Sequence, residues 1–162
     1  MRQAKVIYTN EGAVSIRHIV LGLYSIGRWT SLRGLLNHVE IYVSDLEKTR
    51  EFWGWLLPKL GYKEKLNLDV GIINYVLGET YIVFVQTQES FLDISYHRCR
   101  VGLNHLAFHG DGTAFVDEIT EELRRRGIKI LYEEKHPYAA GPDYYAVFFE
   151  DPDRIKVEIT AH

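Results

Sequence analysis

Hydrophobic and polar positions run through the same order twice along this chain. They alternate at residues 36–43, then take on the period of an amphipathic helix, and the same succession starts again at residue 103. The sequence Leu36-Asn37-His38-Val39 returns there as Leu103-Asn104-His105-Leu106. One long repeat of this kind indicates two supersecondary modules rather than a solenoid of many short ones.

The first copy has clear element boundaries. The alternation at Leu36–Val43 predicts a strand. The sequence Ser44-Asp45-Leu46-Glu47 has capping-box spacing and begins a helix, which Pro58 and Gly61 end. Three further strands are expected, at residues 62–66, 71–77 and 81–87.

The second copy repeats this order. A strand is expected at 103–109, followed by a helix that Asp111 or Thr113 caps and Gly127 ends. The next strands are expected at 128–133, 144–149 and 155–160, with a turn at Asp151-Pro152-Asp153. The predicted fold class is therefore α+β, with two βαβββ modules that pair into a curved mixed sheet and helices outside.

The repeat also sets the domain boundaries. Residues 34–162 form one domain, with module one at 34–88, a linker at 89–101 and module two at 102–162. Residues 1–33 share nothing with the repeat and form an N-terminal extension of unknown role, with a short strand expected at Val6-Ile7-Tyr8. This extension is either an arm packed on the domain or sequence ahead of its true start.

Composition narrows the possible partners. A formal charge of −3 over 162 residues argues against nucleic acid or an anionic membrane. The lone Cys99 excludes an intrachain disulfide and a cysteine-type zinc site, and the simplest compartment is a reducing cytoplasm. Aromatic residues make up 13% of the chain, more than packing needs, so some rings should line a cavity for a small molecule.

The alternation of side chains along each strand identifies candidate site residues. Val39, Ile41 and Val43 should face the helix, which turns His38, Glu40 and Tyr42 to the opposite face. The same argument turns His105, Ala107 and His109 away from the helices, together with Lys156, Glu158 and Thr160 on the last strand. If the sheets curl into one cup, His38, His105 and Glu158 converge inside it.

Two imidazoles and a carboxylate form an open metal site, which leaves coordination positions for water, substrate or dioxygen. Such a site acts as a Lewis acid, a water activator or an oxygen binder. One divalent metal ion is expected, with Zn, Mn, Fe, Ni and Mg not distinguished.

At this point the sequence resembles the vicinal oxygen chelate superfamily, also called the glyoxalase/bleomycin-resistance/extradiol-dioxygenase fold. The resemblance covers about residues 34–162 and is carried by Asn37–Leu46, Phe52-Trp53, Leu60-Gly61-Tyr62, Asn104–Phe108 and Tyr144–Asp153 running to Glu158. It implies that His38, His105 and Glu158 are the metal ligands. Two His and one Glu resemble the set of fosfomycin-modifying enzymes and extradiol dioxygenases.

Two positions depart from the pattern of that family. Matching the modules by their turns places Phe84, which cannot ligate a metal, opposite Glu158, and leaves Gln86 as a weaker substitute for a fourth ligand. Arg154 stands where the family usually has Gly after Asp-Pro-Asp, and a residue with a Cβ is less comfortable at positive φ.

Other residues complete the predicted site. Glu40 is a candidate general base. Alternatively, it is a solvated or salt-bridged strand carboxylate. The loop at 136–142 could close over the mouth of the cup, or be an ordinary surface loop. Candidate residues of the pocket wall are Tyr42, Phe84, His109, Tyr144 and Tyr145.

Two functions fit these features. The first is a glyoxalase-like metal enzyme acting on a small oxygenated substrate by isomerase or lyase, epoxide-opening or oxygenase chemistry. The alternative is a metal-free module that sequesters an aromatic or cationic small molecule, as bleomycin-resistance proteins do. The resemblance implies a homodimer, in which exchanged modules could bring His38 and His105 of one site from different subunits.

Overall fold

The computed structural model describes residues 33–67 and 71–162. The strand expected at Val6–Tyr8 lies outside these residues. The chain divides into one unit at Met1–Leu35 and another at Leu36–His162. The second unit carries every element discussed below.

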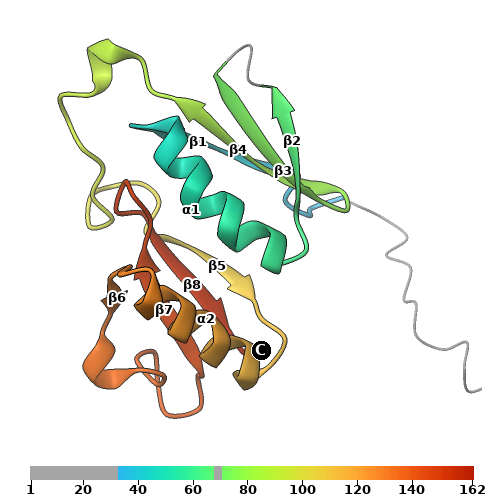
Figure 1. The fold of residues 1–162 in the computed structure, drawn as a ribbon, viewed down its shortest axis with the longest axis vertical. Coiled ribbons are helices and arrows are strands. Elements are labelled where there is room, and N and C mark those ends of the chain that lie inside the picture. Colours follow the sequence, from blue (N-terminus) through green and yellow to red (C-terminus); the bar gives the residue numbers. More distant parts are fainter. Residues whose placement is uncertain (1–32, 68–70) are drawn as a thin grey trace, which may run out of the picture. The chain divides into compact units, whose positions relative to one another are not determined.

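Module one folds as predicted (Figure 1). Its four strands form a mixed sheet in the order β1-β4-β3-β2, with β1 and β4 parallel and the other pairs antiparallel. The helix α1 packs on this sheet. The elements are β1 (His38–Val43), α1 (Leu46–Lys59), β2 (Lys63–Asn67), β3 (Ile72–Leu77) and β4 (Thr80–Gln86).

Module two repeats this topology in the order β5-β8-β7-β6, which confirms the α+β fold with two βαβββ modules. Each module forms its own four-stranded sheet, and β1 and β5 are edge strands of their sheets. The elements are β5 (His105–His109), α2 (Thr113–Arg125), β6 (Ile130–Leu131), β7 (Ala146–Glu150) and β8 (Lys156–Thr160), with short 3-10 helices η4 (Glu89–Phe91) and η5 (Glu133–Lys135).

The helix starts differ from the sequence prediction. Asp45, not Ser44, is the N-cap of α1, and its side chain accepts a hydrogen bond from the backbone N of Lys48 at 3.1 Å. Ser44 instead donates from its backbone N and its hydroxyl to Asp153 of module two. The N-cap of α2 is Gly112, with no capping side chain, so neither Asp111 nor Thr113 caps it.

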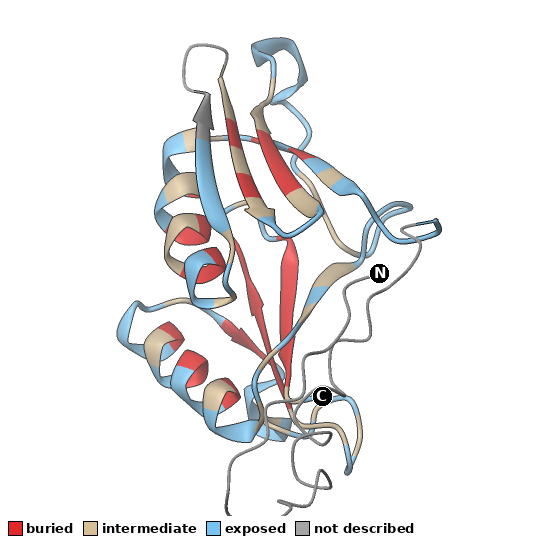
Figure 2. Ribbon diagram, turned by 90° about the vertical axis from the view of Figure 1, so that its right-hand side faces the viewer, coloured by how far each residue is buried: buried red, intermediate tan, exposed pale blue. Residues whose placement is uncertain are grey.

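The hydrophobic core lies between the helices and the sheets and is continuous across both modules. Trp53 of α1 packs against Phe84 of its own sheet and against Phe108 of β5, at centroid distances of 5.1 and 6.2 Å. The buried positions of α1 and α2 face the strands (Figure 2). A shared core of this kind fixes the two modules against each other.

Burial confirms the predicted alternation on β1 and shows an exception on β8. Along β1 the side chains alternate, with His38, Glu40 and Tyr42 exposed. All five residues of β8 are buried. The reason is the segment between β6 and β7, whose Ala139 and Tyr144 pack on the face of the sheet opposite α2. The loop predicted at 136–142 thus covers the sheet of module two.

Candidate metal centre

His105 and Glu158 lie in contact on the face of the second sheet that points away from α2. The Nε2 atom of His105 is 3.0 Å from Oε2 of Glu158. Strands β5 and β8 are parallel neighbours in which Ala107 pairs with Glu158, so His105 stands two residues before that pair and on the same face. Glu158 is 4% exposed, and His105 is half-buried.

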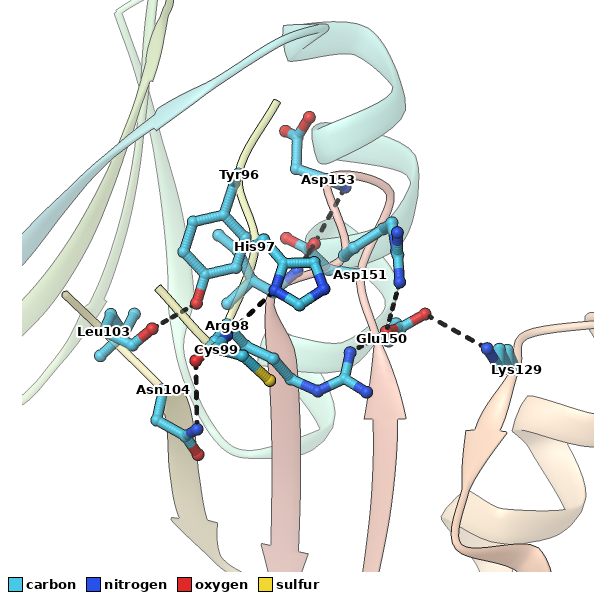
Figure 3. Close-up of polar contacts among 12 residues, drawn as sticks. Tyr96, His97, Arg98, Cys99, Leu103, Asn104, Lys129, Glu150, Asp151 and Asp153 are labelled. Carbon is cyan, nitrogen blue, oxygen red and sulfur yellow. Dashed lines mark hydrogen bonds and ion pairs between the residues drawn. The ribbon is translucent and has the colours of Figure 1, made fainter. Parts of the chain in front are cut away.

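Asn104 orients the imidazole of His105. Its Nδ2 donates to the backbone carbonyl of Arg98 at 3.2 Å (Figure 3), which leaves its Oδ1 facing Nδ1 of His105 at 2.7 Å. Because an amide oxygen only accepts, Nδ1 of His105 must carry the proton. This arrangement leaves the Nε2 atom of a neutral His105 with a free lone pair, the form in which histidine binds metals.

The lone pair of Nε2 then faces a carboxylate oxygen at 3.0 Å. Two atoms with lone pairs do not approach this closely unless a proton or a cation lies between them. The residues therefore suit either an imidazolium–carboxylate pair or a shared metal ion. A separation of 3.0 Å can be spanned by two ligands that each lie about 2.0–2.2 Å from one ion.

Tyr144 holds the other oxygen of the same carboxylate. Its hydroxyl donates to Oε1 of Glu158 at 2.6 Å. This hydrogen bond is the main reason that the pKa of Tyr144 is raised. Such a contact orients a ligating carboxylate in the way that outer-shell partners do in metal sites.

The predicted third ligand is not brought to this pair within one chain. His38 stacks on Tyr81, with ring centroids 4.6 Å apart, and its Nδ1 lies 2.8 Å from Oδ1 of Asn37. Among the described residues, no three His, Cys, Asp or Glu side chains are grouped closely enough to hold a metal ion. The Asn–His contact is nevertheless the same in both modules, and His38 is exposed.

The position predicted for a fourth metal ligand, on the last strand of module one, needs correction. In module two Glu158 pairs with the residue two places after His105, and in module one the residue that pairs with Glu40 is Val83, not Phe84. Phe84 is fully buried against Trp53 and Tyr75, so it lines no pocket.

Gln86 already has structural partners. Its Oε1 accepts from the backbone N of Leu46 at 3.0 Å, and its Nε2 donates to the carbonyl of Ser44 at 2.9 Å. The amide oxygen that would bind a metal is therefore occupied at the start of α1.

The remaining predicted site residues lie elsewhere. Glu40 and Tyr42 line a cavity of about 570 Å³ together with Phe91 and Tyr96 of the linker, and we call it the linker cavity. The phenol of Tyr145 donates to Asp117 of α2 at 2.6 Å, and Tyr145 is not among the residues that line the linker cavity. His109 contacts the backbone carbonyl of His162 and borders a separate depression beside Lys59 and Phe115.

His105 and Glu158 line a cavity of about 340 Å³, which we call the module-two cavity. Of the predicted wall residues, only Tyr144 lines it. Strand parity places Lys156 on the correct face, and this was the signal that could have singled it out as a site residue. The lining residues are His105, Tyr132, Ala139, Ala140, Tyr144, Phe148, Lys156 and Glu158.

Arg154 adopts the backbone conformation that glycine would favour. Its φ is +68°, in the left-handed region. Its backbone N donates to the carbonyl of Asp151 at 2.9 Å, and the Asp151 carboxylate accepts from the backbone N of Ile155 at 2.8 Å. The turn thus keeps its shape without glycine, and Glu158 keeps its place on β8.

Comparison with known proteins defines the family. Residues 35–159 match the model of the Glyoxalase/Bleomycin resistance protein/Dioxygenase superfamily, and the chain belongs to this superfamily. The chain is 54% identical over 126 residues to YqjT of Bacillus subtilis (strain 168), itself uncharacterized, covering 78% of this chain and 98% of that protein.

Solved structures support the same fold. A candidate glyoxalase from Bacillus halodurans superposes with a TM-score of 0.79 at 52% identity, covering 81% of this chain and 98% of that one. A mutant of the fosfomycin resistance protein FosX from Listeria monocytogenes, in complex with Mn(II) and 1S,2S-dihydroxypropylphosphonic acid, superposes with a TM-score of 0.56 at 23% identity, covering 78% and 88%. At that identity the likeness concerns the fold alone.

One further finding concerns the helices. Within residues 33–67 and 71–162, none is long and apolar enough to cross a membrane.

Proposed function

We propose that this chain is a glyoxalase-like enzyme that uses one divalent metal ion to act on a small oxygenated substrate. The observation that carries the proposal is the contact between His105 and Glu158, in which Asn104 fixes the tautomer that leaves Nε2 free for a cation. A divalent ion bound there would polarise substrate oxygens and stabilise negative charge that develops on them.

The residues around the pair have roles that do not depend on which reaction is catalysed. Asn104 and Tyr144 hold the two ligands in place through hydrogen bonds of 2.7 and 2.6 Å. Tyr132 and Phe148 supply apolar walls, and Ala139 and Tyr144 of the segment that follows η5 pack on the sheet face. Isomerase or lyase, epoxide-opening and oxygenase reactions all use a site of this kind.

A second copy of the chain would supply His38 as the third ligand. His38 lies on the edge strand β1 with an exposed ring. Residue 36 just before β1, β1 itself and the linker expose several large apolar side chains, an unusual surface for a monomer. Leu36, Tyr42, Phe91 and Ile94 are each 60–70% exposed. This surface supports a homodimer in which His38 of one subunit meets His105 and Glu158 of the other.

Metal analysis of purified protein after loading with Mn²⁺ tests the proposal. We expect stoichiometric metal in the wild type and its loss in Glu158→Ala. Equal metal contents of the wild type and this variant would refute the metal site.

Mixing two variants that each lack metal tests whether the site is shared between subunits. His38→Ala and Glu158→Ala homodimers should each lack metal. Refolding them together should restore one intact site in each mixed dimer, because one subunit keeps His38 and the other keeps Glu158. No recovery of metal in the mixture would show that the ligands are not shared between subunits.

A metal-free binding function remains the alternative, and the linker cavity favours it. This cavity of about 570 Å³ combines the aromatic rings of Tyr42, Phe91 and Tyr96 with the carboxylate of Glu40, which suits an aromatic cation. That function predicts ligand binding that survives chelation of metals and the substitution His38→Ala but is lost in Glu40→Gln.

A further inference from the structure

Lys156 places a positive charge in the module-two cavity. It pairs in register with His105 across β5 and β8, and it precedes Glu158 by two residues on the same face of β8. The residue is only 9% exposed, and it lines the cavity together with these two side chains.

The ammonium group of Lys156 has no anionic partner among the described residues. Its Nζ lies over the ring of Phe148, 5.6 Å from the ring centroid. Glu158, its neighbour on the strand, is engaged by His105 and Tyr144. Glu150, which is opposite it on β7, is engaged by Arg98, Lys129 and Arg154 (Figure 3 shows the first two).

The side chain of Lys156 is mostly covered, but its ammonium is not among the buried polar atoms that lack a partner, so Nζ reaches the water of the cavity. Lysine often buries its apolar stem in this way and keeps its charged end in water. Because no carboxylate of the described residues pairs with this charge, Nζ is available to a negatively charged ligand that enters the cavity beside the proposed metal ligands.

We propose that the substrate of this site is a small organic oxyanion, whose negatively charged group pairs with Lys156 while an adjacent oxygen faces His105 and Glu158. This inference rests on the proposed function for the second contact only. The cavity of about 340 Å³ is at the lower end of the usual range for small-molecule sites, which favours a compact substrate.

Two ligands that differ only in charge test the proposal. Glycolate and its neutral amide glycolamide have the same hydroxyl oxygen and nearly the same size. Isothermal titration of the Mn²⁺-loaded protein with each should show tighter binding of glycolate. In Lys156→Met this preference should fall by about tenfold or more, the effect of one hydrogen bond to a charged group.

Matched variants separate this role from a structural one. Lys156→Arg keeps the charge and should keep most of the preference for glycolate. Lys129→Met removes an exposed lysine that also lies near Glu150 and should change nothing. Equal binding of the two ligands by the wild type, no binding of either, or an unchanged preference in Lys156→Met would overturn the proposal.

The two proposals can fail separately. Lys156→Met should still bind Mn²⁺, because Lys156 ligates nothing. If the wild type binds no Mn²⁺, the proposed function fails, and inorganic phosphate titrated into the metal-free protein then tests Lys156 alone. Phosphate binding that is lost in Lys156→Met supports the anion site, and binding that is absent or unaffected by the substitution overturns it.

Discussion

The indole of Trp53 donates a hydrogen bond to the carboxylate of Asp151, with Nε1 3.1 Å from Oδ2, and so joins the helix of module one to a turn of module two. The other oxygen, Oδ1, accepts from the backbone N atoms of Asp153 and Ile155 at 2.9 and 2.8 Å. Burial nevertheless dominates and raises the pKa of Asp151 to about 7.

This shift predicts a pH-dependent stability. Between the ordinary value of 3.8 and about 7, the folded protein holds a proton that the unfolded chain has released. The contribution of Asp151 to the free energy of unfolding is therefore largest below pH 4 and falls as the pH rises to about 7. Urea unfolding across this range should show the decline.

Asp151→Asn is the control for that decline. The Asn oxygen can replace Oδ1, whereas its NH₂ group cannot accept from Trp53, so the variant should lose about 1–3 kcal/mol near pH 4. Its remaining stability should be flatter with pH than that of the wild type. Parallel pH profiles for the two proteins would contradict the assignment to Asp151.

Tyr144→Phe should weaken metal binding with little effect on folding. The substitution removes only the hydroxyl that holds Oε1 of Glu158. Loss of such a partner reduces metal affinity by about 10–100-fold in known sites. Titration with Mn²⁺ measures the change, and Tyr145→Phe is the matched control because its hydroxyl contacts Asp117 instead. Similar affinities in the two variants would exclude this role for Tyr144.

Gln86→Ala should reduce stability and leave metal binding intact. The side chain satisfies the backbone N of Leu46 and the carbonyl of Ser44 where α1 begins. Its removal should cost about 1–2 kcal/mol, the usual effect of losing a helix cap. Chemical unfolding and Mn²⁺ titration measure the two properties. A large loss of metal affinity would instead identify Gln86 as a ligand.

Arg154→Gly should stabilise the protein by about 1 kcal/mol, because it removes a Cβ from a left-handed backbone position. Arg154→Ala keeps the Cβ and loses only the exposed ion pair with Glu150, at 3.7 Å, so it should give no gain. Thermal unfolding of both variants checks the difference. A stabilisation by Ala equal to that by Gly would assign the effect to the side chain of arginine rather than to the backbone.

The sequence was sufficient to predict that His105 and Glu158 lie on one face of one sheet, which is half of the candidate site. The repeat placed His105 on its strand, and the period of two placed Glu158 on the same face. Whether His38 joins them depends on how two sheets, or two chains, face each other. No local pattern encodes that arrangement.

The error at Phe84 has a physical origin. The turn between β3 and β4 is Gly78-Glu79, whereas β7 and β8 are joined by the longer segment 151–155. Because the turns differ in length, matching the modules by their turns selects Phe84 instead of Val83, the residue that is equivalent to Glu158. A shift of one residue moves a side chain to the other face of the sheet. The same shift applies to Gln86, which has the parity of Phe84. The N-cap of α1 is Asp45 rather than Ser44, because Ser44 is engaged by Asp153, a partner that is distant in the sequence.

The linker between the modules is coupled to the orientation of the His105 ring. The main-chain oxygen of Arg98 holds the amide of Asn104, which in turn aims the ring of His105. A change of length or sequence in the linker would therefore alter the direction of that imidazole while leaving His105 and Glu158 themselves unchanged.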